Sequence, residues 1–267
     1  MSRISAKFEE LRRKREGALI AFLTAGDPRP SFTPKLVEII SKHADVVELG
    51  IPFSDPIADG PSIQKATDRA LREGTTPETV LRIIKQIRRK SETPLVIMTY
   101  YNILLKPGVR NFVRRFAAAG IDGIIIPDLP LEESGELLRA ANEHGVDLIF
   151  LAAPTTPRER LERICKKSSG FLYLVSLLGV TGARKELPSF VRPLISEAKK
   201  VSRVPVAVGF GISKPGQVAN VIRAGADGAI VGSAFVNIIE KNLKNEKRML
   251  KEIDAFGKEL KAATRTS

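Results

Sequence analysis

Short runs of apolar residues alternate with longer amphipathic segments along the whole chain. The runs lie at residues 19–24, 46–50, 94–100, 124–127, 148–151, 171–176, 204–209 and 229–232. Continuous apolar runs of this length are typical of parallel strands that are buried on both faces. The segments between them carry apolar residues at helical spacing, as at Val80, Ile83, Ile84 and Ile87. The pattern therefore predicts eight strands, each followed by a helical segment.

The order of these elements predicts one (β/α)8 TIM barrel, an α/β fold that occupies residues 1–267 as a single domain. No linker or change of composition divides the chain. A doubly wound open sheet is the alternative, but no G-x-G-x-x-G turn follows the first strand. We expect residues 2–15 to form an extra N-terminal helix that closes the barrel bottom. Residues 237–261 are expected to be helical, with an interruption near Asn245.

Barrel topology separates residues that enter strands from residues at strand exits, where the active sites of this fold lie. An aspartate enters four of the strands, at Asp45, Asp122, Asp147 and Asp227. We interpret these four as turn or capping residues. The two histidines, His43 and His144, also precede strands. A histidine base or a histidine metal site is therefore not expected, and no metal is predicted.

The formal charge of +13 raises the question of nucleic-acid binding. The basic residues lie in mixed-charge helical segments, and the chain has no Trp and only three Tyr to stack on bases. We therefore predict a solvated basic surface and no nucleic-acid partner.

No apolar run is long enough for a membrane span, and the acidic residues of the first segment do not fit a targeting peptide. A cytoplasmic protein is expected, in which the single Cys165 packs in the core.

Two carboxylates mark the exit of the second strand. Glu48 lies near the end of that strand, and Asp59 follows in a segment that three prolines stiffen. Paired carboxylates in different environments can carry out acid and base chemistry at neutral pH. Asp55 in the same segment is a competing candidate, although a residue before a proline also suits a turn. The segment predicts a carboxylate-based active site.

Glycine-rich segments follow the last three strands. Residues 178–188 have the character of a lid, and residues 209–213 and 232–234 follow the seventh and eighth strands. Glycine lets the backbone approach a ligand, and helix starts bind anions, so these loops predict a phosphate-bearing ligand. A Schiff-base aldolase needs an inner-strand lysine, and none of the eight predicted strands contains one. A metal-dependent aldolase is disfavoured by the placement of both histidines.

The whole chain resembles the tryptophan synthase alpha chain family. The resemblance rests on F-L-T-A-G-D-P at 22–28, E-L-G-I-P-F-S-D-P-I-A-D-G-P at 48–61, M-T-Y-Y-N at 98–102, I-P-D-L-P-L-E-E at 126–133, G-V-T-G at 179–182, G-F-G-I-S at 209–213 and G-S-A at 232–234. The second of these segments is highly specific, whereas the glycine loops alone are not. The segments cover seven of the eight strand exits in order.

This resemblance implies a lyase that splits indole-3-glycerol phosphate into indole and D-glyceraldehyde 3-phosphate by retro-aldol cleavage. It implies that Glu48 moves the protons and that Asp59 accepts the indole N–H. It also implies that Thr181 orients Asp59 when the lid closes. The implied indole contacts are Phe22, Tyr100, Ile125 and Tyr173, and the implied phosphate contacts are Gly182, Gly211, Gly232 and Ser233.

The resemblance further implies a partner, the tryptophan synthase beta chain, in an α2β2 heterotetramer. Pyridoxal phosphate is expected only in that beta chain, and no cofactor is expected in this chain. The segment around Pro52–Pro56 and the lid are expected on the docking face. Arg184 and Lys185 in the lid receive no role.

Several alternatives stay open at the level of sequence. The chain could be a catalytically weak alpha-like subunit that acts mainly as an allosteric partner of a beta chain, or another phosphate-binding TIM-barrel enzyme. A basic protein that also binds nucleic acid is a further alternative. Asp27 and Asp128, which lie beside prolines at strand exits, could contact substrate or serve as turn and capping residues.

Overall fold

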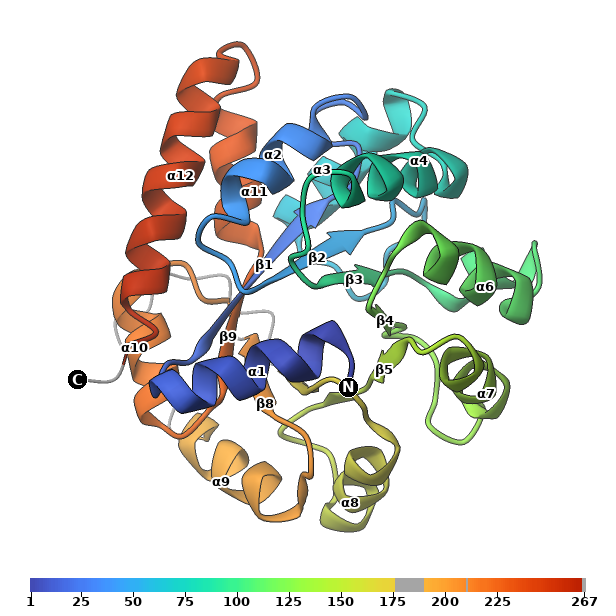
Figure 1. Cartoon of the computed structure of the whole chain (residues 1–267), viewed down its shortest axis with the longest axis vertical. Helices are drawn as coiled ribbons and strands as arrows, with labels where there is room; N and C mark the ends of the chain where they lie inside the picture. The colour runs from blue at the N-terminus through green and yellow to red at the C-terminus, as the bar shows by residue number, and fades with distance from the viewer. Residues whose placement is uncertain (176–189, 210, 266–267) are drawn as a thin grey trace.

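A closed barrel of parallel strands lies at the centre of the molecule (Figure 1). The computed structural model describes residues 1–175, 190–209 and 211–265, and within these residues it contains nine parallel strands. The strands are β1 (Ala18–Thr24), β2 (Val46–Gly50), β3 (Leu95–Met98), β4 (Gly123–Ile125), β5 (Asp147–Ile149), β6 (Leu151–Ala152), β7 (Leu172–Val175), β8 (Val206–Gly209) and β9 (Gly228–Val231).

The fifth predicted strand is divided into two short strands at the point where the barrel closes. The sheet order runs β5-β4-β3-β2-β1-β9-β8-β7-β6, so the two edge strands β5 and β6 are separated only by Phe150. β5 pairs with β4, while β6 pairs with β7. The N–H of Tyr173 donates to the carbonyl of Phe150 over 3.0 Å and continues the ladder across this junction. The (β/α)8 prediction is therefore confirmed, with its fifth strand bonding to its two neighbours through different halves.

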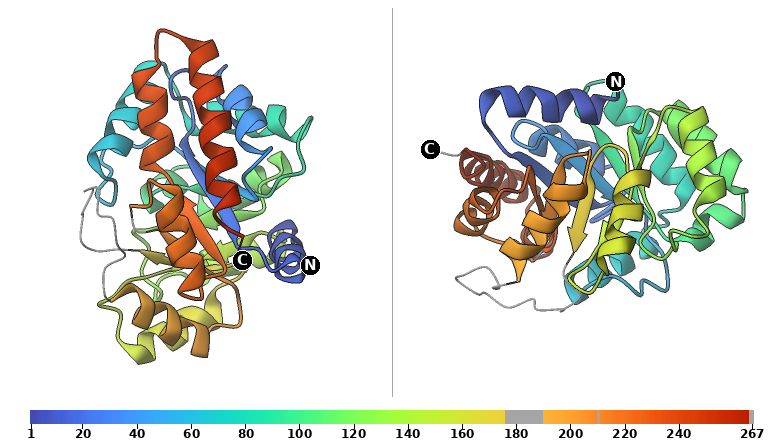
Figure 2. Two further views of the ribbon diagram at one scale, coloured as in Figure 1. Left: turned by 90° about the vertical axis from the view of Figure 1, so that its left-hand side faces the viewer. Right: turned by 90° about the horizontal axis from the view of Figure 1, so that it is seen from below.

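Helices surround the barrel on all sides (Figures 1 and 2). Those in the described residues are α1 (Arg3–Lys14), α2 (Thr33–Ile40), α3 (Pro61–Arg72), α4 (Pro77–Arg88), α5 (Tyr101–Leu105), α6 (Val109–Ala119), α7 (Gly135–Glu143), α8 (Arg158–Lys167), α9 (Val191–Val201), α10 (Pro215–Arg223), α11 (Ser233–Lys241) and α12 (Glu246–Ala262). None of the helices in these residues has the length and apolar content that a membrane span requires.

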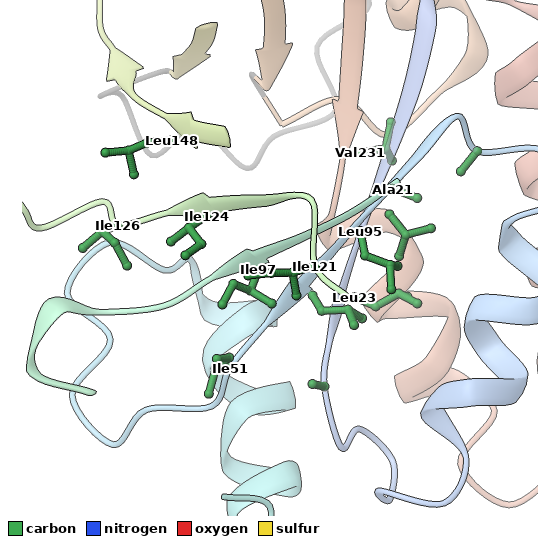
Figure 3. Close-up of a cluster of buried hydrophobic side chains, with 14 of the residues drawn as sticks. Ala21, Leu23, Ile51, Leu95, Ile97, Ile121, Ile124, Ile126, Leu148 and Val231 are labelled. Carbon is green, nitrogen blue, oxygen red and sulfur yellow. The ribbon is translucent and has the colours of Figure 1, made fainter. Parts of the chain in front are cut away.

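The strands are mostly apolar because they are buried on both faces. On β1, Leu19, Ala21 and Leu23 pack in the outer core between strands and helices, whereas Ala18 and Ile20 pack inside the barrel. Figure 3 shows part of the outer core, including the labelled side chains of Ala21, Leu23, Ile97 and Ile124. Alternate residues of one continuous apolar run thus fill two different cores.

The N-terminal helix closes one end of the barrel. Ile4, Phe8 and Leu11 of α1 belong to the inner core, which is the cluster of side chains inside the barrel. The ring of Phe8 lies 5.9 Å from that of Phe171. The helix begins where the Ser2 side chain accepts the N–H of Ser5. This placement confirms the prediction that residues 2–15 form a helix that closes the barrel bottom. The opposite end of the barrel is left open for a site.

Aspartates at the strand entrances join neighbouring strands, which is a wider function than the predicted turn or capping function. In each of three cases the carboxylate accepts the N–H of a residue at the start of the adjacent strand. The bonds run from Leu19 to Asp45 (2.8 Å), from Leu95 to Asp122 (2.8 Å) and from Val206 to Asp227 (2.7 Å). Each carboxylate also pairs with a cation, namely Lys261, Arg88 and Lys199 respectively.

Candidate active site

Glu48 is the only carboxylate among the described residues that is placed on an inward-facing strand position beside the barrel opening. In register it lies opposite Phe22 on β1 and Val96 on β3, one inward position beyond Val46. The side chain is 1% exposed, and no described residue forms a hydrogen bond with its Oε2 atom. Burial, together with the negative charge of Asp59, raises the pKa of Glu48 to about 8.

Asp59 reaches the same opening from the segment between β2 and α3. Pro61 occupies the first turn of α3, and the Gln64 side chain donates to the Asp59 carbonyl over 2.8 Å, so the helix start holds Asp59 in place. The Tyr100 hydroxyl accepts the N–H of Ala58 over 3.0 Å and fixes the segment from the other side. Burial raises the pKa of Asp59 to about 6, and a hydrogen bond with Tyr100 partly opposes that effect.

Both carboxylates face a cavity of about 240 Å³ at the carboxyl ends of the strands. Its remaining walls are mostly apolar side chains and glycine backbone, provided by Phe22, Ala58, Gly60, Ile63, Met98, Pro127, Leu151, Tyr173, Val175, Gly209, Gly211, Ile212, Ile230, Gly232 and Ser233. An apolar wall beside a buried carboxylate favours the protonated form of that carboxylate. The cavity can therefore hold one protonated and one ionised carboxyl group near pH 7.

Tyr173 lies on β7 beside the two carboxylates. Burial and the negative charges of Glu48 and Asp59 raise its pKa well above the usual value, so the phenol keeps its proton. Gly209 on β8 makes room for this ring, because a Cβ atom there would lie 2.7 Å from the phenol oxygen. The side chain thus presents a hydroxyl donor to the carboxylate end of the cavity.

Another part of the cavity wall is formed by backbone at the start of α11 and by the loop before α10. Gly232 is the N-cap of α11, and Ser233 is its first residue. Gly211 has a φ of 62°, a left-handed conformation that glycine adopts without strain, and it precedes α10. The first amides of an α-helix have no intrahelical acceptor and carry the positive end of its dipole. This side of the cavity is therefore suited to an anionic group.

The structure brings most of the sequence-predicted site residues together. Phe22, Glu48, Asp59, Tyr173, Gly211, Gly232 and Ser233 all line the cavity. Ile125 is fully buried in the inner core, and Tyr100 is 3% exposed, with its ring 5.2 Å from that of Phe53. These two residues support the site from behind its surface. Thr181 and Gly182, with the rest of the expected lid, lie outside the described residues.

Sequence reasoning missed several apolar wall residues. Met98, Leu151 and Val175 each lie two positions after an inward-facing residue, namely Val96, Ile149 and Tyr173. Extending the period of two along each strand to its exit would have identified them. Ile63 and Ile212 lie on a helix and a loop, where no such period applies.

The remaining candidates have structural contacts. The Asp128 carboxylate accepts the N–H of Tyr101 over 2.9 Å and so caps α5. Asp27 is fully buried and pairs with Arg69, while Asp55 is exposed and accepts a hydrogen bond from Ser54. His43 pairs with Asp254 of α12 over 2.9 Å.

Metal-ligating side chains do not cluster in the described part of the chain. No group of three or more His, Cys, Asp or Glu residues there is placed to hold a metal ion. Cys165 is 2% exposed and packs in the outer core, in agreement with its predicted place.

Comparison with known proteins gives one consistent result. A family model described as "Tryptophan synthase alpha chain" matches residues 8–265. The tryptophan synthase alpha chain of Methanocaldococcus jannaschii is 49% identical over 255 residues, which cover 95% of this chain and 90% of that protein. The one from Trichormus variabilis is 48% identical over 268 residues, with full coverage of both chains.

A solved structure gives the same result. The structure of the tryptophan synthase a2b2 complex from Pyrococcus furiosus contains a chain that superposes with a TM-score of 0.87 at 45% identity. The match covers 92% of this chain and 98% of that chain. Similarity therefore extends over sequence and fold together.

Proposed function

The chain belongs to the tryptophan synthase alpha chain family, and we propose that Glu48 and Asp59 carry out the alpha reaction of this family. In that reaction indole-3-glycerol phosphate is cleaved to indole and D-glyceraldehyde 3-phosphate, a lyase step of tryptophan biosynthesis. The observation that supports the assignment best is the pair of carboxyl groups with different pKa values at one apolar cavity, about 8 for Glu48 and about 6 for Asp59.

Glu48 has the properties of a group that both gives and takes a proton. With a pKa of about 8 it is mostly protonated at pH 7 and can donate to the indole carbon that bears the side chain. The resulting carboxylate then takes the proton of the neighbouring side-chain hydroxyl as the carbon–carbon bond breaks. One proton enters the substrate and one leaves it, so Glu48 returns to its starting state.

Asp59 has the complementary properties. With a pKa of about 6 it is mostly ionised at pH 7, and it can accept the indole N–H and stabilise the positive charge that develops on the ring. Phe22 and the other apolar wall residues suit the indole, and the protonated Tyr173 can donate a hydrogen bond beside Glu48. Tyr100 and Ile125 would shape this region from the second layer.

The phosphate group of the substrate is assigned to the glycine side of the cavity. The amides around Gly211, Gly232 and Ser233 would bind it, with Gly182 as a further contact expected from the family. Thr181 is proposed to orient Asp59 on closure of the lid, which would also exclude water.

The family relation also assigns a partner. The chain assembles with a tryptophan synthase beta chain, as in the a2b2 complex of Pyrococcus furiosus. Ile57 supports a docking surface beside the site, because its side chain is 83% exposed on the segment that carries Asp59.

We propose that pyridoxal phosphate belongs to the beta chain alone and that this chain needs no cofactor. A cytoplasmic location is proposed because the phosphorylated substrate is retained inside cells; cell fractionation tests it.

An indole-release assay with indole-3-glycerol phosphate tests the proposal. We expect Glu48→Gln to lose about 10²–10⁴-fold in kcat and Asp59→Asn to lose about 10²–10³-fold. Asp55→Asn is the matched control, because Asp55 lies on the same segment but is exposed, and it should retain wild-type activity. A wild-type protein that releases no indole, even with a beta chain present, overturns the assignment. Equal losses for Asp55→Asn and Asp59→Asn would refute the specific role of Asp59.

A further inference from the structure

Two neighbouring helices bring the two halves of the cavity together. α3 begins at Pro61, two residues after Asp59, and α11 begins beside the proposed phosphate contacts, with Gly232 as its N-cap. The helices pack against each other through Ala66 and Val236, which form a small core with Phe22 below the cavity. Each helix therefore carries one half of the site at its N-terminal end.

A buried ion pair ties α3 to the exit of β1. The Arg69 guanidinium donates to both oxygens of Asp27, with Nε–Oδ1 at 2.8 Å and Nη2–Oδ2 at 2.9 Å. Asp27 is fully buried, and the Arg69 side chain is 19% exposed. A two-point contact of this kind fixes the orientation of the arginine as well as its distance.

The same guanidinium faces α11. The Nη1 atom of Arg69 lies 3.6 Å from Oε1 of Glu240, and Nζ of Lys65 lies 3.5 Å from the same oxygen. Arg69 and Glu240 lie eight and seven residues after the first residues of their helices, or roughly 12 and 10 Å along the axes. The contact thus joins the two helices at nearly equal distances from the cavity.

We propose that Arg69 is a positioning residue that sets the separation between the Asp59 carboxylate and the phosphate-binding start of α11. It does so by holding α3 on Asp27 and α11 on Glu240 at the same time. The inference rests on the proposed function, because the separation matters for a ligand that reaches both halves at once. An indole-glycerol phosphate spans the two halves, whereas indole alone or glycerol 3-phosphate alone occupies one of them.

The test uses the full chain with its beta partner. It compares a two-ended ligand, which reaches both halves of the cavity, with one-ended ligands, which occupy only one half. Arg69→Met should lower kcat/KM for indole-3-glycerol phosphate about 10–100-fold, the size expected for a misplacement of about 1 Å. The inhibition constant of indole and the dissociation constant of glycerol 3-phosphate should each change less than about twofold. Arg69→Lys keeps the positive charge but not the two-point contact of the guanidinium with Asp27, so it should recover part of the loss. Arg72→Met, at an exposed arginine of the same helix, should match wild type.

A second variant keeps the proposal testable if Arg69→Met does not fold. Glu240→Gln leaves the Asp27–Arg69 pair in place and weakens only the contact to α11, so a smaller loss with the same ligand pattern is expected. Equal weakening of one-ended and two-ended ligands, or full activity of folded Arg69→Met, would overturn the positioning inference alone. A wild-type enzyme that releases no indole overturns the proposed function and this inference with it.

Discussion

Burial of a carboxyl group beside apolar side chains raises its pKa, so the group can act as an acid near neutral pH. The same burial lowers the stability of the folded protein at pH values where the carboxyl group would otherwise ionise. Glu48 gains a pKa of about 8 because burial and Asp59 disfavour its charged form. An apolar residue at the same strand position would have no ionisable group to bury and so would not reduce the free energy of unfolding in this way. We therefore expect Glu48 to influence both the pH dependence of the reaction and the stability of the barrel.

The reaction should show a bell-shaped pH dependence in kcat/KM. Activity should rise as Asp59 ionises, near pH 6, and fall as Glu48 loses its proton, near pH 8. Steady-state indole release between pH 5 and about 9.5 measures both limbs. Asp59→Asn should abolish the lower limb in its residual activity and move the upper limb to lower pH, because the Asp59 charge helps to raise the pKa of Glu48. A profile that stays flat through pH 8 would contradict the assignment of Glu48 as the initial acid.

Glu48→Gln should stabilise the protein at alkaline pH. The unfolded chain loses the Glu48 proton near its ordinary pKa of 4.5, whereas the folded protein keeps it to about pH 8. Folding takes up a proton in this window, so the contribution of Glu48 is fully present below pH 4.5 and is lost as pH rises through 8. The difference in pKa corresponds to at most ~5 kcal/mol.

Urea unfolding at several pH values measures this effect. The stability of Glu48→Gln relative to wild type should increase between pH 5 and 8.5. Glu9→Gln, which changes an exposed carboxylate on α1, should give a difference that is constant over the same range. A constant difference for Glu48→Gln as well would show that the folded-state pKa of Glu48 is ordinary.

At the scale of elements, the cavity exists because glycines on the strands leave space for large neighbours. Gly209 on β8 lies against the Tyr173 ring on β7, and Gly50 on β2 lies against Phe22 on β1. A Cβ atom at Gly50 would come within 2.7 Å of the Phe22 ring. The orientation of both aromatic side chains toward the cavity thus depends on the absence of a neighbouring side chain.

Gly209→Ala should impair the site through Tyr173. The added Cβ would lie 2.6 Å from Cε2 of the ring, so the ring must move toward the cavity. We expect a loss of about 1–3 kcal/mol in the free energy of unfolding and a raised KM. Gly216→Ala on α10 is the control, because a Cβ there meets no atom within 4 Å; its stability should stay equal or rise by up to ~1 kcal/mol. Unchanged KM in Gly209→Ala would contradict the argument.

At the scale of the whole molecule, the two ends of the chain meet at the bottom of the barrel. Lys261 of α12 pairs with Glu16 at 3.2 Å and with Asp45 at 2.9 Å, and Asp45 in turn accepts the N–H of Leu19 on β1. Glu16 and Arg265 also form an isolated antiparallel bridge. Because both ends pack on the same barrel, we propose that residues 1–267 form one domain.

Lys261→Met should therefore destabilise the whole barrel. It leaves Asp45, whose side chain is 10% exposed, without this cation, and we expect a loss of about 1–3 kcal/mol in the free energy of unfolding. Lys251→Met, at an exposed lysine of the same helix, should stay within about 0.5 kcal/mol of wild type. Chemical denaturation followed by circular dichroism measures both variants. Equal stabilities would show that α12 does not depend on this pair.

The sequence by itself determined the barrel, its open end and the pair of carboxylates. Strands buried on both faces need continuous apolar runs, and Glu48 interrupts such a run at its exit. The helical interruption near Asn245 was also predictable, because the Asn245 side chain caps α12 locally. These features depend on residues that are close along the chain, so the pattern of the sequence contains them.

Only the tertiary structure decided the features that join distant segments. The division of the fifth strand at Phe150, the bonds of the strand-entrance aspartates and the placement of Tyr100 behind the cavity depend on neighbours that the sequence does not place together. The same holds for Arg69 between Asp27 and Glu240. A raised pKa likewise reflects burial and charge in three dimensions. The sequence thus determined which groups are present, and the fold decided which of them meet.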